Sequence, residues 1–578
     1  MIAALLKKEV LLLGLLYFSS AFATDAEDFR VVEKNINETQ RQLEDQVKED
    51  IERGIGNKGG FNKLEFKVDE KEMKKDSGDG NCINITAIEY EGDDRIPLSF
   101  KEDIKAEYLN KCLTAIDIES IMSLVVNWFI SEGFSTTRVY LEAQNLTAGT
   151  LKLRVQDGIV SDIILEDGGK KSIYLPSLFP FMKGKTLELT KIEQGVHQAN
   201  KQRSNRATME IESGENPGDS VVVVKNKKSY PIHLNFSIDN HGSRSTGKVQ
   251  GATTITADNF IGINDILTYT HRESISEIHV NNPGESISDS LALVVPFGFF
   301  THTFTFSKSK YESDLLTPSG TVLVSSGESI NAGVTVDRVM YRNADTIINT
   351  YLRLNFNRGK NYLNGSYLAV NSKDTTTATV GTAFNSRLFN NPISFSLDFS
   401  RGLSLFGAEE AIHNLPFNFP VNLFSKIEGT ISYIQSLDFM LQGLTLSSSI
   451  NGQYAFDNLP SSQRISIGSR YSVRGYVENS LSGDNGSYIR NELILNNPFE
   501  IKWQDINTRI NAGYDIGWVE NRYDLNNSLD GWLSGGSLGL TVLWRKLAAT
   551  FSYDFPLNQP SILPEESGQF WWRLNLDI

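Results

Sequence analysis

The 578-residue chain is short of long apolar runs and of basic residues, and each shortage argues against a class of protein. After residue 23 no apolar run reaches the length of about eighteen residues that a membrane-spanning helix needs. The nearest run, Leu291 to Phe300, is about half that length and contains Pro and Gly. Because 70 acidic residues outnumber 55 basic ones, the formal net charge is −15, which argues against a nucleic-acid partner.

Motifs for catalysis and cofactor binding are also missing. The chain contains no HExxH, no phosphate-binding Gly-Lys loop and no CxxC, and its seven histidines lack the spacing of metal ligands. The segment from Gly535 to Gly539 does match G-x-S-x-G, but the serine of that motif must sit on a strand-turn-helix. Ser537 lies instead in SLGLTVLW, which has the pattern of a membrane strand. We therefore predict no enzymatic activity, no metal and no cofactor.

The first 23 residues have the three parts of a secretory signal peptide. Lys7 and Lys8 precede a short apolar run from Val10 to Phe18, and Ala21-Phe22-Ala23 forms an A-x-A cleavage site. A membrane anchor is the alternative, but the apolar run is too short to span a bilayer. We predict that residues 1–23 are cleaved off, so the mature chain is exported and is either soluble or a β-barrel.

Only two cysteines occur, Cys82 and Cys112. In an oxidising compartment an isolated pair about thirty residues apart favours a disulfide, whereas a redox or metal role would need further ligands or a CxxC. We predict a structural disulfide between them.

From Asp25 to Arg53 the chain is highly charged, with ten acidic and five basic residues and no Gly or Pro. Its apolar residues form a narrow stripe at helical spacing, namely Phe29, Val32, Ile36, Leu43, Val47 and Ile51. We predict one helix over residues 24–56 and a flexible linker over residues 57–81. Such a helix buries little by itself, so it is either a solvated arm or the occupant of a hydrophilic site.

Residues 82–157 have the pattern of a compact α/β domain. The predicted elements are strands at Ile83–Ile85 and Ile88–Tyr90, a helix near Phe100–Leu109, a helix from Asp117 to Gly133, and strands at Arg138–Leu141 and Leu151–Val155. Asp117 is expected to be the N-cap of the second helix. The core face of that helix is predicted to consist of Ile118, Ile121, Leu124, Val125, Trp128 and Phe129.

Residues 158–229 repeat this organisation in a second α/β domain. The predicted elements are a strand at Ile159–Leu165, a short helix at Leu175–Phe181, a longer helix with Ile192, Val196 and Ala199 on its core face, and strands at Ala207–Ile211 and Ser220–Val224. Thr190 and Glu193 have the spacing of a capping box at the start of the longer helix.

Residues 230–578 have the pattern of strands alone. Ile232, Leu234, Phe236 and Ile238 alternate with polar residues, and the segment from Trp572 to Ile578 alternates in the same way. Period-two segments separated by turns recur between them. At roughly 22 residues per strand with its connection, this region holds about fourteen to eighteen strands. A soluble sandwich also alternates, but this length without a helical segment favours a closed membrane barrel.

Two short motifs in the barrel region are complementary in charge. Ser472-Val473-Arg474-Gly475-Tyr476 lies in a predicted loop, and Gly513-Tyr514-Asp515-Ile516-Gly517 lies in a strand that alternates strictly from Ile506. Asp515 falls on the polar face of that strand, which faces the lumen of a barrel. We predict that Arg474 reaches Asp515 and forms a bidentate pair. The alternative is that the loop with Arg474 is an ordinary surface loop and that Asp515 is a lumen-facing acid unrelated to it.

VRGY in a loop, followed by GxDxG in a later strand, resembles the two-partner secretion transporters (TpsB), which are related to the barrel-assembly insertases. The two α/β domains resemble their POTRA domains. Asp239, Asn240 and Gly242 match the D-N-x-G segment of the family's first strand, and Leu481 to Leu493 matches the segment after VRGY. The resemblance implies a barrel of about 16 antiparallel strands, a loop folded into it, and an N-terminal plug helix.

The resemblance also implies function and location. It places the barrel in the outer membrane of a Gram-negative bacterium, with POTRA domains in the periplasm at 82–157 and 158–229 and the barrel at 230–578. The expected activity is export of a large partner exoprotein, received unfolded or partly folded by β-augmentation. Other implied partners are outer-membrane lipid and the barrel-assembly machinery. An insertase that folds other barrels into the membrane is the second interpretation, and a simple diffusion porin is a poorer third.

Overall fold

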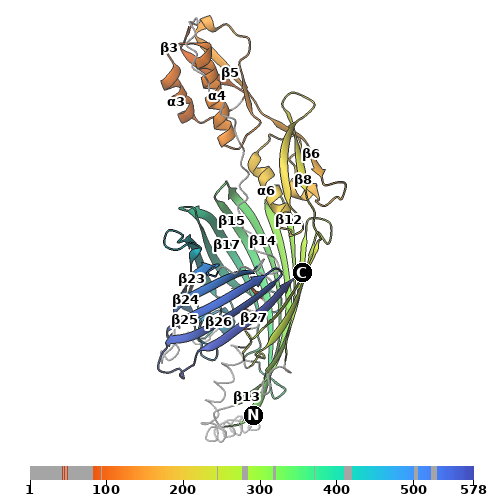
Figure 1. Cartoon of the computed structure of the whole chain (residues 1–578), viewed down its shortest axis with the longest axis vertical. Helices are drawn as coiled ribbons and strands as arrows, with labels where there is room; N and C mark the ends of the chain where they lie inside the picture. Colours follow the sequence, from red (N-terminus) through yellow and green to blue (C-terminus); the bar gives the residue numbers. More distant parts are fainter. Residues whose placement is uncertain are drawn as a thin grey trace, which may run out of the picture.

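The computed structural model describes residues 39, 42, 45, 48, 49, 82–92, 94–243, 245–275, 284–316, 320–369, 371–408, 419–499, 506–522 and 530–578. The predicted signal peptide and linker, and most of the predicted N-terminal helix, lie outside the described residues. Two α/β units are joined in series to a barrel, and the second unit sits against one end of the barrel (Figure 1).

The first α/β unit packs two helices against a three-stranded sheet of order β2-β5-β4. Its elements are β1 (Ile83–Ile85), β2 (Ala87–Glu91), α3 (Leu98–Tyr108), β3 (Lys111–Leu113), α4 (Ala115–Ser131), β4 (Arg138–Tyr140), η1 (Leu146–Ala148) and β5 (Thr150–Gln156). β3 was not predicted from the sequence, and it pairs with β1. A disulfide joins Cys82, beside β1, to Cys112 on β3. It therefore cross-links the first residues of the unit to β3, the strand between its two helices.

The start of α4 differs from the sequence prediction. Thr114, not Asp117, is the N-cap residue, and Asp117 is the third residue of the helix. The Asp117 carboxylate accepts hydrogen bonds from the Thr114 backbone N–H at 2.7 Å and from its hydroxyl at 2.8 Å. The two residues form a capping box, so the acid stabilises the helix from inside its first turn. Leu124, predicted in the core face, is 37% exposed.

The second α/β unit has a three-stranded sheet of order β6-β8-β7. Its elements are β6 (Ile159–Glu166), α5 (Leu175–Leu178), α6 (Leu189–Ala199), β7 (Ala207–Ser213) and β8 (Asp219–Asn226). The predicted capping box at Thr190 is wrong, because α6 begins at Leu189 and its N-cap residue, Glu188, makes no side-chain cap bond. The Leu189 N–H donates instead to the carbonyl of Gly133 in the first unit, at 2.8 Å. This contact between the two units satisfies a backbone N–H at the start of α6 in place of a side-chain cap.

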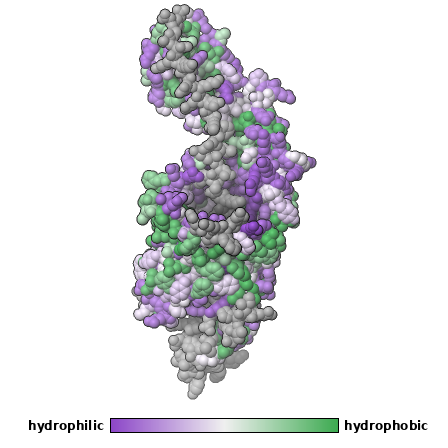
Figure 2. Space-filling model, in the orientation of Figure 1, coloured by the Kyte–Doolittle hydropathy of each residue, from purple (hydrophilic) through white to green (hydrophobic). Residues whose placement is uncertain are grey.

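Sixteen antiparallel strands close into a barrel, as predicted, and the short β16 (Ser366–Tyr367) pairs back onto the end of β15. The sixteen are β9 (Ile232–Asp239), β10 (Gln250–Asp258), β11 (Ile266–Ser274), β12 (Gly284–Phe297), β13 (Phe300–Leu316), β14 (Val322–Arg342), β15 (Ile347–Leu363), β17 (Asp374–Leu388), β18 (Asn391–Leu403), β19 (Ser425–Ser436), β20 (Leu444–Ala455), β23 (Asn485–Asn496), β24 (Ile506–Glu520), β25 (Gly531–Trp544), β26 (Leu547–Asn558) and β27 (Gln569–Asp577). Figure 2 shows hydrophobic side chains gathered over the barrel wall, while the two α/β units are mostly hydrophilic.

Strand alternation places apolar side chains outside the barrel and polar ones inside, as the sequence predicts. On β24 Tyr514 is 47% exposed on the outer face, whereas its neighbour Asp515 is fully buried on the lumen side. The barrel closes where β27 pairs with β9 over five residue pairs, from Arg573 opposite Asp239 to Asp577 opposite Asn235. Among the described residues no helix is long and apolar enough to cross a membrane.

Candidate functional site

The loop between β20 and β23 folds into the barrel lumen and is held there by one strand of the wall. It contains a short hairpin of β21 (Ile465–Ile467) and β22 (Leu481–Gly483). Between these strands the backbone carries Arg474 to Asp515 on β24. The guanidinium Nε donates to Asp515 Oδ2 at 2.6 Å and Nη2 donates to Oδ1 at 2.9 Å. The Arg474 backbone N–H also donates to Oδ2, at 3.1 Å.

Burial makes this bidentate pair strong. Asp515 is fully buried and Arg474 is 6% exposed, so water does not compete for either group. Arg474 Nη1 also donates to Glu492 Oε1 on β23 at 3.1 Å. Removing one member of a buried charge pair leaves the other uncompensated, which typically costs about 3–5 kcal/mol.

The glycines of the two motifs make room for the pair. Gly475 has a φ of +101°, and a Cβ there would meet the carbonyl carbon of Phe555 on β26 at 2.5 Å. A side chain at Gly513 would occupy the position of the Arg474 guanidinium. At Gly517 a Cβ would meet Tyr488, Ile467 and Val473 at 2.8–3.0 Å. A glycine is therefore required at each of these positions, because the loop and the barrel wall approach too closely for a side chain.

The other loop-motif residues form an apolar core within the lumen. Val473 and Tyr476 are buried in a cluster that combines loop and wall residues, the others being Ile467, Leu481, Val519 and Leu533. The Tyr476 hydroxyl lies 2.9 Å from the Ser534 carbonyl and 2.7 Å from the Asn558 carbonyl. The loop is thus folded and packed against the barrel wall through an apolar cluster as well as through the Arg474–Asp515 pair.

Polar residues from the N-terminal segment also lie inside the barrel. Thr39, Gln42, Asp45, Lys48 and Glu49 are helical, and all are polar. The Thr39 hydroxyl lies 2.7 Å from that of Ser245. Glu49 accepts from the Tyr471 hydroxyl of the loop at 2.9 Å and from Arg573 Nη1 of β27 at 3.3 Å.

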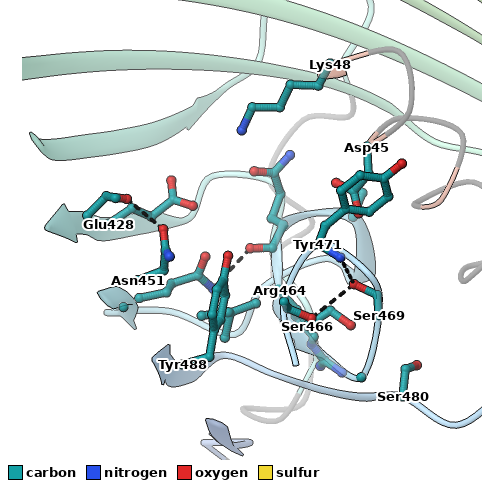
Figure 3. Close-up of a pocket in the computed structure, with 18 of the residues that line it drawn as sticks. Asp45, Lys48, Glu428, Asn451, Arg464, Ser466, Ser469, Tyr471, Ser480 and Tyr488 are labelled. Carbon is teal, nitrogen blue, oxygen red and sulfur yellow. Dashed lines mark hydrogen bonds between the residues drawn. The ribbon is translucent and has the colours of Figure 1, made fainter. Parts of the chain in front are cut away.

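A polar cavity of about 440 Å³ remains between this segment, the loop and the barrel wall. Figure 3 shows Asp45 and Tyr471 on one side of the view, Glu428 and Asn451 of the wall on the opposite side, and Lys48 above them. Its lining is charged and hydroxyl-rich, so this unfilled part of the lumen suits water.

The first-strand motif lies where the barrel closes. Asp239, which is fully buried, accepts from Arg573 Nε at 2.9 Å and Nη2 at 2.7 Å across the β9–β27 pairing. Asn240 Nδ2 donates to the Phe570 carbonyl at 2.8 Å, and Asn240 Oδ1 accepts from the Trp572 N–H at 2.7 Å. A Cβ at Gly242 would overlap the carbonyl of Gly247. The motif therefore joins the first strand to the last.

Comparison with known proteins places this architecture in a family. Residues 218–542 match the model of the haemolysin secretion/activation proteins ShlB/FhaC/HecB, residues 83–158 match the ShlB-type POTRA domain, and residues 159–213 match a further POTRA domain. The chain belongs to the ShlB/FhaC/HecB family. Its two α/β units are hence POTRA domains, and the protein is an outer-membrane transporter of two-partner secretion rather than an insertase.

Individual relatives agree with this assignment. The chain is 28% identical to the outer membrane transporter CdiB of Dickeya dadantii (strain 3937), with 86% of this chain and 87% of the relative covered. It is also 28% identical to the hemolysin transporter protein ShlB of Serratia marcescens, with 80% of each covered. The solved structure of CdiB from Escherichia coli superposes with a TM-score of 0.79 at 25% identity, covering 94% of this chain and 98% of that one.

Several residues that hold the loop were missed by sequence reasoning. Glu492 lies in the segment from Leu481 to Leu493, which resembles the family's segment after VRGY, so this resemblance could have marked it. Glu566, in the connection before β27, accepts from the backbone N–H groups of Val477, Glu478 and Asn479 at 2.6–3.0 Å. No local pattern marks Glu566. Ser537 lies within β25, as predicted, and donates to Asp554 Oδ1 at 2.6 Å.

The second POTRA domain is fixed to the barrel by α6 and the segment after it. Gln198 Nε2 donates to the carbonyls of Gly298 and Phe300, each at 3.2 Å, at the β12–β13 turn. Arg203 pairs with Asp577 of β27 at 2.5 Å. The pKa of His197 in α6 is lowered to about 3, mainly by burial and also by the cations Arg342 and Lys201. His197 is therefore neutral at pH 7.

Proposed function

We propose that the barrel exports one large exoprotein and that the N-terminal helix, residues 24–56, blocks the lumen until export begins. The observation that supports this is the double contact of Glu49, which is bonded to the loop through Tyr471 and to the closing strand through Arg573. An extended polypeptide cannot share the lumen with that helix, so the helix must leave while the Arg474–Asp515 pair keeps the loop docked.

The exoprotein reaches the barrel through the periplasm and is received by the POTRA domains. Each POTRA sheet has two edge strands, β2 and β4 in the first and β6 and β7 in the second. An unfolded chain can add to such an edge through main-chain hydrogen bonds, with neighbouring pockets for its side chains. The transport step uses no catalytic residue, and the protein acts as a conduit without enzymatic activity.

The close approach of Thr39 to Ser245 provides a test. Cysteines at Thr39→Cys and Ser245→Cys replace two hydroxyl oxygens 2.7 Å apart, so a disulfide can lock the segment to the barrel. The described residues contain no free cysteine that would compete. Secretion of the exoprotein should stop in the oxidised double variant and return after reduction. The single variant Thr39→Cys is the control. Undiminished secretion by the oxidised, cross-linked protein would contradict the proposal.

A further inference from the structure

The connection between β26 and β27 contacts the lumen loop at the outer end of the barrel. β27 ends at Asp577, which pairs with Arg203 of the second POTRA domain, so this end of the strand faces the periplasm. The connection, residues 559–568, precedes the other end of β27 and therefore lies on the extracellular side. It contacts the limb of the loop that returns from Tyr476 to β22.

One carboxylate of this connection binds three consecutive backbone N–H groups of the limb. Glu566 Oε1 accepts from Val477 at 2.6 Å and from Glu478 at 3.0 Å, and Oε2 accepts from Asn479 at 3.0 Å. These residues lie outside the β21–β22 pairing, which begins at Leu481. Successive N–H groups turned toward one point bind an anion well, and a charged acceptor forms stronger bonds than a neutral one. The Glu566 carboxylate therefore fixes the limb where the strand pairing does not.

Two further contacts join the connection to the loop. The side-chain amide of Asn479, which is buried, donates to the carbonyl of Pro564 at 2.7 Å. Leu563 packs against the apolar cluster that contains Val473 and Tyr476. These contacts hold the connection against the limb, so the Glu566 carboxylate stays within reach of the three N–H groups.

We propose that Glu566 is a positioning residue for secretion, which holds the outer limb of the loop while the Arg474–Asp515 pair holds its inner turn. The two attachments are close in sequence, because Val477 follows Arg474 by three residues. Release of the limb therefore loosens the backbone beside the guanidinium and lets the limb move into the exit path. Glu566 acts through the loop, and its role does not depend on the plugging role of the N-terminal helix.

Amide hydrogen exchange of the purified full chain in detergent tests the bonds themselves. In Glu566→Ala the amides of residues 477–479 should exchange about tenfold faster or more, because each loses a charged acceptor. The substitution removes a group of the size of acetate, beside a cavity of about 250 Å³ that Val477, Glu478 and Glu566 line. Sodium acetate should therefore bind in its place and slow the exchange, whereas sodium chloride at the same concentration should not. A connection that is merely misfolded would not respond to acetate.

The amount of exoprotein in the medium tests the role in secretion. Glu566→Ala should lower secretion about threefold or more, because the limb loses its charged acceptor. Glu566→Gln keeps the volume and one neutral acceptor oxygen, so it should lower secretion less. The control is Glu565→Ala, which removes the same charge from the preceding, exposed residue and should secrete as the native protein does. Heat-dependent gel migration verifies that each barrel is folded.

The proposal is overturned if folded Glu566→Ala exchanges as the native protein does, if acetate slows its exchange no more than chloride, or if Glu565→Ala has the same defect. Faster exchange with undiminished secretion would also overturn it, since the bonds would then hold the limb without serving transport. Should Glu566→Ala fail to fold, the pair Glu566→Gln and Glu565→Gln gives the same comparison of exchange and secretion without a loss of volume.

Discussion

At the scale of single residues, two of the arginine–aspartate pairs in the lumen are bidentate or doubly bonded and connect distant parts of the chain. Arg474 with Asp515 fixes the loop to β24, and Arg573 with Asp239 fixes the last strand to the first. Both aspartates are fully buried. Because each arginine also contacts a glutamate, Glu492 or Glu49, neither aspartate is the sole partner of its arginine.

The loop pair gives the first prediction. Arg474→Ala and Asp515→Ala should each lower secretion about tenfold or more while the barrel still reaches the membrane. Each removes the bidentate partner of a buried charge and leaves it a weaker contact, Arg490 for Asp515 and Glu492 for Arg474. Arg474→Lys should recover little, because an ammonium cannot reproduce the planar fork. The control Arg509→Ala removes another β24 arginine, which contacts Asn496. The measurement is the amount of exoprotein in the medium.

The exchange of Arg474→Asp with Asp515→Arg should restore secretion only in part. An aspartate at 474 would face Glu492, and an arginine at 515 would face Arg490, whose Nε lies 3.8 Å from the Asp515 carboxylate. If the single-variant defects simply add in the double variant, the two residues are not coupled. Normal secretion by both single variants would remove this support for a docked loop.

Gly475 gives a prediction that does not involve charge. Gly475→Ala should displace the loop, because its φ of +101° disfavours a side chain and the new Cβ would collide with Phe555. Limited proteolysis of the folded barrel should then cut the loop faster. Gly429→Ala on β19 is a suitable control, since its nearest neighbours would lie at 3.7–3.8 Å, which is ordinary contact. Equal cleavage rates in the two variants would contradict the expectation.

At the scale of whole elements, the N-terminal helix contacts both the loop and the barrel wall through Glu49. Deleting residues 25–53 should raise ion conductance in a planar bilayer while leaving the barrel folded, because the lumen loses its occupant. Glu49→Ala should have the same effect to a smaller degree, since it removes the bonds to Tyr471 and Arg573. Glu119→Ala in the first POTRA domain is the control. Unchanged conductance after the deletion would make the helix a periplasmic arm.

The disulfide is expected to stabilise only the first POTRA domain. Cys82 and Cys112 should be inaccessible to an alkylating probe until the protein is reduced, and two reactive thiols in the native protein would contradict the bond. Replacing both by Ser should lower the free energy of unfolding of that domain by about 2–4 kcal/mol. Barrel closure should be unaffected, because the bond lies wholly within the first domain.

The presence of the helices and strands could be predicted from the sequence better than their first and last residues or their long-range contacts. Strict alternation at Ile506 to Gly517 predicts both the strand and the lumen face of Asp515, because side-chain direction in a strand has a period of two. The start of α6 could not be predicted, since its first N–H is satisfied by Gly133 of the other POTRA domain. Glu566 likewise acts on backbone groups nearly ninety residues away in sequence, and no local pattern encodes that contact.

At the scale of the whole molecule, the junction between α6 and the barrel should respond to pH. His197 has a folded-state pKa of about 3, below its ordinary value of 6.5. The unfolded state therefore binds more protons as the pH falls below about 6.5, and stability is lost from there down to about pH 3. At pH 5 the loss is at most about 2 kcal/mol. Amide hydrogen exchange of α6, corrected for intrinsic rates, measures this loss.

The variant His197→Gln removes the titrating ring and should show a smaller change in α6 protection between pH 7.5 and pH 5. The exchange of α4 in the first POTRA domain provides an internal reference in the same sample. An equal pH response in the native protein and the variant would assign the effect to other groups.

The bond between Glu49 and Arg573 has a consequence for the order of assembly. Arg573 is aligned for this contact by Asp239, which it meets only when β27 has paired with β9. The anchor for Glu49 is therefore complete only in a closed ring, and an unfinished ring offers the helix a weaker hold. The N-terminal helix is therefore expected to bind firmly in the lumen only after the barrel has closed. Barrel closure, the last step of assembly, would then also create the plugged resting state from which export begins.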